Sequence, residues 1–131
     1  MYTMKQVCEQ TGLSYDTLKY YCNEGLVPNV KRDQNNRRVF SERDIAWIKS
    51  LQCLKNCEMG IAEIQSYIHL CKMGKKTIPK RMEMLEKKSW QLRQKIHELE
   101  ASIDFIEHKQ QLYQDMLEGK AEYYSNLVIE N

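Results

Sequence analysis

The fold is decided by residues 11–48, which read TGLSYDTLKYYCNEGLVPNVKRDQNNRRVFSERDIAWI. Ser14 is a typical N-cap residue and Gly25 is typical of the position that ends a helix, so a helix is expected between them. The residues before this stretch are apolar at helical spacing: Met4, Val7 and Cys8. Two short helices joined by a turn that contains Gly12 predict a helix-turn-helix.

A β-hairpin is expected after the second helix. Pro28 disfavours helix at the residue before it, so the chain leaves the second helix in extended form. Val30 and the pair at 39–40 favour β-structure, and they flank a polar tip at 33–36. The run KRDQNNRR at 31–38 makes this hairpin basic. A hairpin beside a helix-turn-helix is a wing.

Two further helices complete the expected core. Ser41 is a typical N-cap for the third helix, and Gly60 separates this helix from the fourth. The inner face of the third helix is expected to hold Ile45, Ile48, Leu51, Gln52 and Leu54. The fourth helix has its apolar positions at Ile61, Ile64, Ile68 and Leu70.

A long heptad pattern begins at Ile78. The alternating 4-3 spacing gives Ile78, Met82, Leu85, Ser89, Leu92, Ile96, Leu99, Ile103, Ile106, Gln110, Tyr113 and Leu117. Almost all of these residues are apolar, and neither Gly nor Pro interrupts the pattern after Pro79, so it predicts a coiled-coil helix. Forty helical residues extend roughly 60 Å, too far to fold back on a small head. The seam therefore predicts a homodimer that pairs through Met82, Leu85, Leu92, Ile96, Leu99, Ile103 and Ile106.

The expected architecture is mainly α-helical and has three parts. Residues 1–75 form a winged helix-turn-helix domain and residues 76–118 the dimerisation helix. Gly119 then interrupts the helix. The apolar residues after it predict that 119–131 forms a short C-terminal helix or tail: Tyr123, Tyr124, Leu127, Val128 and Ile129.

Composition excludes several classes of protein. The chain has 131 residues, a net charge of +2, five Gly and two Pro, too few turn residues for a many-stranded β protein. It contains no apolar run long enough for a membrane span and no signal-peptide pattern at its start. Five cysteines, an odd number, favour free thiols in a reducing cytoplasm. Motifs for phosphate loops or nucleophile elbows are missing, so no enzyme and no cofactor are expected.

The predicted head has the residues of a DNA-binding module. Lys19 and Tyr20 on the second helix, together with Arg37 and Arg38 on the wing, suit phosphate oxygens. Tyr15 and Asp16 begin the second helix, where residues that contact base edges usually lie. Asp16 either accepts a hydrogen bond from a cytosine amino group or only caps the helix. Two heads on one dimer predict a palindromic target in double-stranded DNA.

These residues resemble the N-terminal domain of the MerR family of bacterial transcription regulators. The family's threonine-leucine-arginine-tyrosine-tyrosine run is matched here by Thr17, Leu18, Lys19, Tyr20 and Tyr21, and its wing arginine and tyrosine by Arg38 and Phe40. Two departures stand out, because Lys19 lacks the guanidinium fork and Phe40 lacks a hydroxyl.

The resemblance implies a mode of action. Family members bind promoter DNA as dimers on an antiparallel coiled coil, distort overlong spacers, and thereby act on RNA polymerase through the promoter. The resemblance also places Thr17 in the DNA-binding element. It implies a cytoplasmic, nucleoid-associated protein that binds no membrane.

The effector is expected to act on cysteine. Metal-sensing family members carry cysteines after the long helix, and no cysteine follows Cys71 here, so no metal site is expected. Cys53 and Cys57 lie one helical turn apart in IKSLQCLKNCEMGIAEI, which resembles the branch that responds to aldehydes, electrophiles or thiol stress. Nearby Lys49 favours a thiolate, and Cys57, the more exposed of the two by expectation, is a candidate resolving thiol.

Alternatives to this reading stay open. The alternative for Cys53 is that it is only a small buried core residue, as free cysteine often is. Cys8 and Cys22 are expected in the core. A zinc site from Cys53, Cys57, His69 and Cys71 has suitable ligand types but poor spacing. At the level of the whole protein, a regulator without a small effector and a coiled-coil adaptor that binds no DNA are the rival functions.

Overall fold

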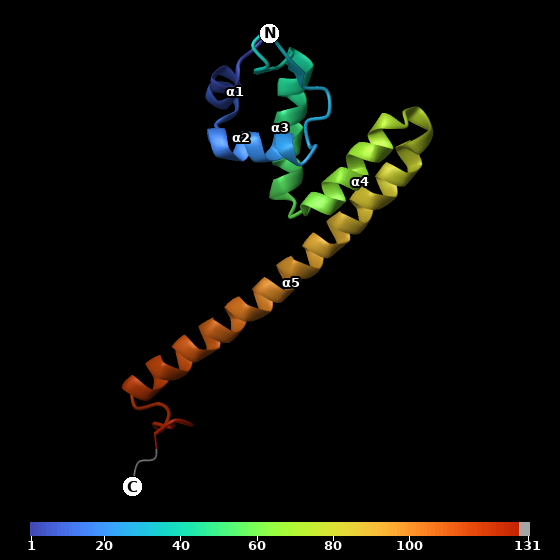
Figure 1. Ribbon diagram of the computed structural model, residues 1–131. Coiled ribbons are helices and arrows are strands. Elements are labelled where there is room, and N and C mark those ends of the chain that lie inside the picture. Colours follow the sequence, from blue (N-terminus) through green and yellow to red (C-terminus); the bar gives the residue numbers. More distant parts are fainter. Residues whose placement is uncertain (129–131) are drawn as a thin grey trace. The chain divides into compact units, whose positions relative to one another are not determined.

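The computed structural model describes residues 1–128, which are mainly helical (Figure 1). In chain order the elements are α1 (Met4–Thr11), α2 (Tyr15–Asn23), β1 (Lys31–Arg32), β2 (Arg38–Val39), α3 (Glu42–Asn56), α4 (Ile61–Lys72), the 3-10 helix η1 (Lys75–Thr77) and α5 (Ile78–Leu117). The chain divides into two compact units, Met1–Lys88 and Ser89–Asn131. The predicted winged helix-turn-helix and the long C-terminal helix are confirmed.

The helix-turn-helix is defined by its caps. Thr3 and Gln6 form a capping box at the start of α1, and Gly12 ends α1 in the left-handed region at φ 77°. The Ser14 side chain then accepts a hydrogen bond from the Thr17 N–H at 3.1 Å and caps α2. Gly25 also has a positive φ, 72°, where a Cβ would be strained. The two helices therefore begin and end where these local signals predict.

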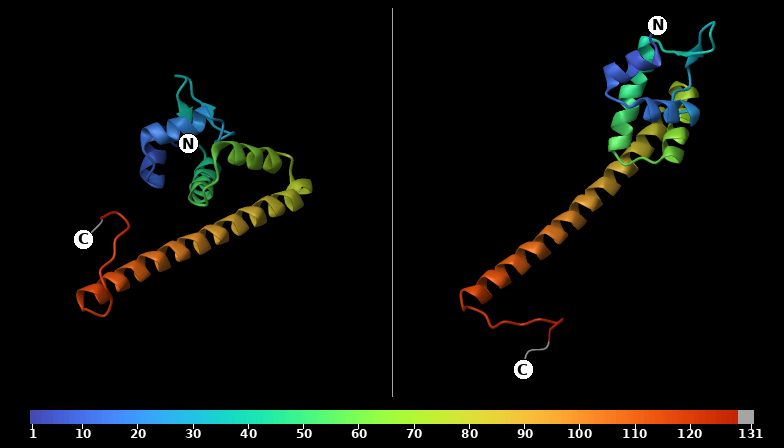
Figure 2. Two further views of the ribbon diagram at one scale, coloured as in Figure 1. Left: turned by 90° about the horizontal axis from the view of Figure 1, so that it is seen from below. Right: turned by 60° about the vertical axis from the view of Figure 1, so that its left-hand side comes forward.

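The wing is a small antiparallel hairpin that protrudes from the first unit (Figure 2, right). Lys31 pairs with Val39 and Arg32 with Arg38. The Asp33 carboxylate accepts hydrogen bonds from the backbone N–H groups of Asn35 and Arg37, both at 2.9 Å. This Asx-type turn holds the tip in one shape. The chain's second residue extends the sheet through a bridge to Phe40.

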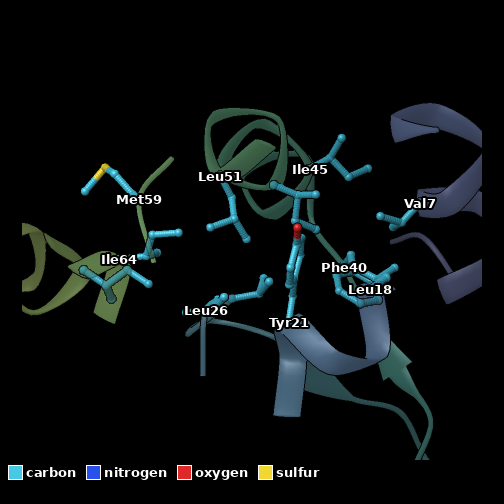
Figure 3. Close-up of a cluster of buried hydrophobic side chains, with 12 residues drawn as sticks. Val7, Leu18, Tyr21, Leu26, Phe40, Ile45, Leu51, Met59 and Ile64 are labelled. Atoms are coloured by element: carbon cyan, nitrogen blue, oxygen red, sulfur yellow. The ribbon is translucent and has the colours of Figure 1, made fainter. Parts of the chain in front are cut away.

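The core of the first unit gathers residues from α1, α2, α3, α4 and the connections between them (Figure 3). Its buried members are Val7, Leu18, Tyr21, Leu26, Val27, Phe40, Ile45, Ile48, Leu51, Met59, Ile64 and Ile68. Two long-range hydrogen bonds tie α3 to the helix-turn-helix. The Trp47 indole N–H donates to the Leu26 carbonyl at 2.6 Å, and the Gln52 amide donates to the Thr11 carbonyl at 2.9 Å.

The first turns of α5 belong to the first unit, and polar contacts join η1 and α5 to α4 and to the turn that follows it. The Thr77 hydroxyl donates to the Leu70 carbonyl, and the Arg81 guanidinium donates to the Gly74 carbonyl at 2.6 Å. Further along, the Lys88 ammonium lies 3.0 Å from a Glu63 carboxylate oxygen. This cation holds the pKa of Glu63 below its usual range. Polar contacts therefore fix the connection between α4 and α5 and also join the two helices further along their length.

The apolar seam of α5 is uncovered in the single chain. None of the described residues of this helix is buried. All seven residues predicted for dimerisation are exposed except Leu92, which is half-buried. Trp90, Phe105 and Leu112 are also exposed but lie outside the 4-3 series. No helix within residues 1–128 has the length and apolar character needed to cross a membrane.

The prediction of a short C-terminal helix is wrong for the residues that the structure describes after Leu117. Residues 118–128 form turns and irregular backbone, and Ile129 lies outside the described residues. Gly119, at φ 76°, ends α5, and the N–H groups of Lys120 and Ala121 return to the Asp115 carbonyl. Because a segment this short gains few helical hydrogen bonds, helix nucleation there is unfavourable without packing against another surface.

Candidate nucleic-acid interface

The second helix separates a buried face from an exposed one. Leu18 is fully buried and Tyr21 nearly so, and burial raises the pKa of the Tyr21 hydroxyl. On the opposite side Tyr15 is 56% exposed and Tyr20 is 48% exposed. Lys19 is exposed beside them. The aromatic and cationic residues that the sequence singled out on this helix therefore face solvent together.

At the start of α2, Ser14 caps the helix, and the carboxylate of Asp16 is not needed for the cap. The Ser14 hydroxyl donates to the Thr17 hydroxyl at 2.8 Å, besides accepting from its N–H. Thr17 is half-buried in this arrangement, so its hydroxyl is engaged in the cap. Asp16 lies in the first turn with an exposed side chain. Since Ser14 supplies the cap, the carboxylate of Asp16 remains directed to solvent at the helix N-terminus.

The wing arginines are held in different ways. The guanidinium of Arg38 donates to the Asn23 side-chain oxygen at 2.6 Å, which links β2 to the end of α2. Arg32 donates to the Asn36 carbonyl at 2.9 Å across the hairpin. Arg37 is exposed next to them. Sequence reasoning missed Asn23, because its partner lies fifteen positions away along the chain.

A basic hollow joins these elements. It encloses about 490 Å³ between the start of α1, the start of α2 and the wing. Its lining includes one lysine, three arginines and one tyrosine: Lys5, Arg32, Arg37, Arg38 and Tyr15. The single acidic residue in the lining is Asp33, whose carboxylate is engaged by the wing turn. Such a concave cationic surface attracts phosphate. Lys5 and Arg32 are further residues that the sequence analysis did not single out.

The cysteines are placed differently from expectation. Cys53 is exposed on α3, whereas Cys57 is half-buried and packs against the core. The expectation that Cys57 is the more exposed thiol is wrong, because Cys57 ends α3 where the chain turns towards the buried Met59. Cys8 and Cys22 pack against the core as expected. Burial raises the pKa of both thiols.

A metal centre finds no support in the geometry. Within residues 1–128, no three side chains of His, Cys, Asp or Glu come close enough to hold a metal ion. The zinc alternative at Cys53, Cys57, His69 and Cys71 is therefore not assembled in the described part of the chain.

Residues 2–70 match the family model described as "MerR HTH family regulatory protein". The chain belongs to the MerR family of transcription regulators. The matched span contains α1, α2, the wing, α3 and most of α4. The MerR resemblance seen in the sequence is therefore confirmed. Regulators of this family are not enzymes, which agrees with the missing catalytic motifs.

Relatives extend the MerR assignment beyond the matched span. An uncharacterized HTH-type transcriptional regulator of Haemophilus influenzae is 36% identical over 113 residues, covering 86% of this chain and 84% of that protein. The regulator AdhR of Bacillus subtilis is 38% identical over 80 residues, covering 61% of this chain and 57% of AdhR. Both similarities are to proteins named as transcriptional regulators.

A solved structure gives the most informative comparison. HiNmlR, described as a MerR family regulator lacking the sensor domain and bound to promoter DNA, matches with a TM-score of 0.72 at 36% identity. The match covers 88% of this chain and 91% of that one. A MerR family regulator of Listeria monocytogenes, described as putative, matches with a TM-score of 0.77 at 27% identity. This MerR chain therefore shares its fold with HiNmlR over most of both chains.

Proposed function

We propose that this MerR-family chain is a homodimeric, sequence-specific regulator that binds and distorts promoter DNA. The observation that carries the proposal is the basic hollow between α1, α2 and the wing. Lys19, Tyr20, Arg37 and Arg38 contact phosphates, and Tyr15, Asp16 and Thr17 bring the start of α2 to the base edges. HiNmlR, which is bound to promoter DNA, supports this assignment by its similarity.

Homodimerisation follows from the exposed seam of α5. Apolar residues at 4-3 spacing face solvent along the helix, and a second copy is the simplest surface that covers them. The dimer is an antiparallel coiled coil in which residues 76–118 join two heads of residues 1–75, with 119–131 as a tail. Two heads recognise a palindrome in an overlong promoter spacer, and distortion of that spacer realigns the promoter for RNA polymerase.

Salt dependence tests the DNA-binding proposal. The affinity for a palindromic fragment from the protein's own promoter region is measured by fluorescence anisotropy between 50 and 200 mM salt. Because phosphate contacts release counterions, a binder that uses the basic hollow loses affinity steeply, on the order of a thousandfold for about six contacts. A coiled-coil adaptor would leave the anisotropy of the DNA unchanged at every salt concentration, and this result would overturn the proposal.

Regulation through the exposed thiol of Cys53 is the second part of the proposal. An electrophilic carbon, such as that of an α,β-unsaturated carbonyl, bonds to the sulfur, and the proton ends on the substrate's α-carbon. Exposure of Cys53 on α3 supports this role. The Cys53 carbonyl also accepts the Cys57 N–H at 3.1 Å, so an adduct would lie beside the turn that ends α3.

A matched pair of variants tests the thiol. Cys53→Ser is expected to abolish induction by an added aldehyde or enone in a reporter strain, whereas Cys71→Ser leaves it unchanged. Mass spectrometry after exposure to the same electrophile locates the adduct. Unchanged induction in Cys53→Ser would favour a regulator without a cysteine effector.

A further inference from the structure

A second pocket lies on the first unit, apart from the basic hollow. It encloses about 290 Å³ and is lined by the connection after α2, by the first turns of α3 and by the end of α4. The residues that matter for its chemistry are Pro28, Arg43, Trp47, Ile68, Cys71 and Lys72. None of them was assigned a role in DNA contact, and the volume approaches that of small-molecule sites in proteins.

One part of the pocket wall, formed by Trp47 and Ile68, is apolar. The indole N–H of Trp47 donates to the Leu26 carbonyl, which leaves the hydrocarbon ring as the surface offered to a ligand. Ile68 is 6% exposed and adds an aliphatic wall. An apolar molecule of modest size therefore gains by leaving water for this surface.

The charges that line the pocket favour an anion. Arg43 and Lys72 are both exposed cations of the lining. Asp44 is the acidic residue among them, but it is buried and accepts the Ser41 N–H at 2.9 Å as part of the α3 cap. Its carboxylate is thus held by a backbone hydrogen bond at the N-terminus of α3, while the two cations remain available to a ligand.

The position of the pocket connects it to the wing. Pro28 lies on the segment that runs from α2 to β1, and Arg43 and Asp44 also border a neighbouring hollow of about 510 Å³ that includes Lys31 of β1. A ligand seated here contacts the connection on which the spacing of α2 and the wing depends. If the segment between α2 and β1 can adopt two positions, a ligand that binds more tightly to one of them increases the population of that position.

We infer that the pocket between α3 and α4 is an effector site for small amphipathic carboxylates. The hydrocarbon part packs on Trp47 and Ile68, and the carboxylate lies between Arg43 and Lys72. This assigns a ligand site to a regulator whose relative HiNmlR is described as lacking the sensor domain. The regulatory consequence rests on the proposed DNA-binding function, whereas binding of the carboxylate does not.

Intrinsic fluorescence measures binding directly. The chain has two tryptophans, and Trp90 lies on α5, so Trp90→Phe leaves Trp47 as the only reporter. Octanoate is expected to bind saturably at sub-millimolar concentration and to change the fluorescence of Trp47. Octanamide, an uncharged molecule of the same chain length, is expected to bind about tenfold more weakly. Arg43→Met and Lys72→Met should each weaken octanoate about three- to tenfold and leave octanamide unchanged.

Cysteine protection gives a readout that does not depend on fluorescence. Octanoate should slow alkylation of Cys71 by iodoacetamide at least severalfold and leave the rate at Cys53, outside the pocket, unchanged. Absence of both the fluorescence change and the protection in the millimolar range overturns the site. Equal binding of octanoate and octanamide overturns the assigned ligand class.

A DNA titration in the presence of octanoate distinguishes failure of the effector role from failure of the proposed DNA-binding function. Saturating octanoate is expected to change the affinity for promoter DNA about fivefold or more, at constant ionic strength, in the Trp90→Phe chain. When Lys72→Met is added to that chain, the octanoate concentration that gives half of this change should rise about three- to tenfold. Octanoate binding without any change in DNA affinity overturns the effector role. A chain that binds octanoate but no DNA at any salt concentration refutes the proposed function instead.

Discussion

Removal of the wing guanidinium by Arg38→Ala should weaken binding to every DNA sequence by a similar factor. Arg38 is half-buried against Asn23 at the mouth of the basic hollow, and a homodimer carries two copies of it. Each phosphate contact contributes about 0.9 to the slope of log affinity against log salt, so the variant's slope should be shallower by about 1.8. If the loss is purely electrostatic and vanishes near 1 M salt, it amounts to roughly 60-fold at 0.1 M.

Anisotropy titrations at several salt concentrations check this figure. From 50 to 200 mM salt the deficit of the variant should fall from about 200-fold to about 20-fold. Asn23→Ala is the matched control, since it removes the hydrogen-bond acceptor and retains the charge: its slope should equal that of the parent chain, with a loss of only a few-fold. Arg93→Ala removes the same charge from α5 and should have little effect.

Two results would refute the reasoning about Arg38. A deficit that stays constant as salt rises would mean that the guanidinium does not neutralise a phosphate. A deficit that differs strongly between operator and unrelated DNA would mean that Arg38 contacts base edges, contrary to its assignment.

Three further predictions concern the seam, the core and the connection between α4 and α5. Leu99→Lys should convert the dimer to a folded monomer in sedimentation velocity, whereas Gln91→Lys, outside the seam, should not. Phe40→Ala should lower the free energy of unfolding in urea by about 3–5 kcal/mol, because its side chain is fully buried; a loss below 1 kcal/mol would contradict the packing. Glu63 has a pKa below its usual 4.5, so its pairing with Lys88 stabilises the fold above that pH and is lost as pH falls through the lowered value. Glu63→Gln should therefore be slightly less stable than the parent at pH 7, and this difference should shrink as pH falls below 4.5 and through the lowered pKa of Glu63. A difference that does not change as pH falls would contradict the ion pair.

Local chemistry explains which parts of the fold the sequence could predict. Ser14 and Ser41 cap helix N-termini and Gly12 ends a helix, in each case through backbone groups only a few residues away. These helix ends can therefore be predicted from the sequence without knowledge of the tertiary structure. The seam of α5 is likewise a property of one helix. The tail after Gly119 differs, because an apolar composition indicates a need for burial but does not specify a helix.

The site was harder to predict because its members come together only in space. Lys5 and Arg32 are far apart in the sequence, yet both line the hollow beside Arg38. The exposure of Cys53 and Cys57 depends on where α3 ends and on which face of the helix meets the core. Their spacing of one helical turn predicts neither of these features. Residue type identified the cations of α2 and the wing, and only packing identified their neighbours.

The seam and the basic hollow are energetically linked in the proposed dimer. One head offers a single hollow and one exposed face of α2, an area suited to non-specific contact with phosphates. Joining two heads makes the second contact intramolecular, which raises the affinity by roughly 100-fold or more without any new contact. Leu99→Lys should therefore lose operator binding by at least this factor, although every residue of the hollow is unchanged. A monomeric Leu99→Lys chain that still bound the palindrome as tightly as the parent would show that a single head suffices.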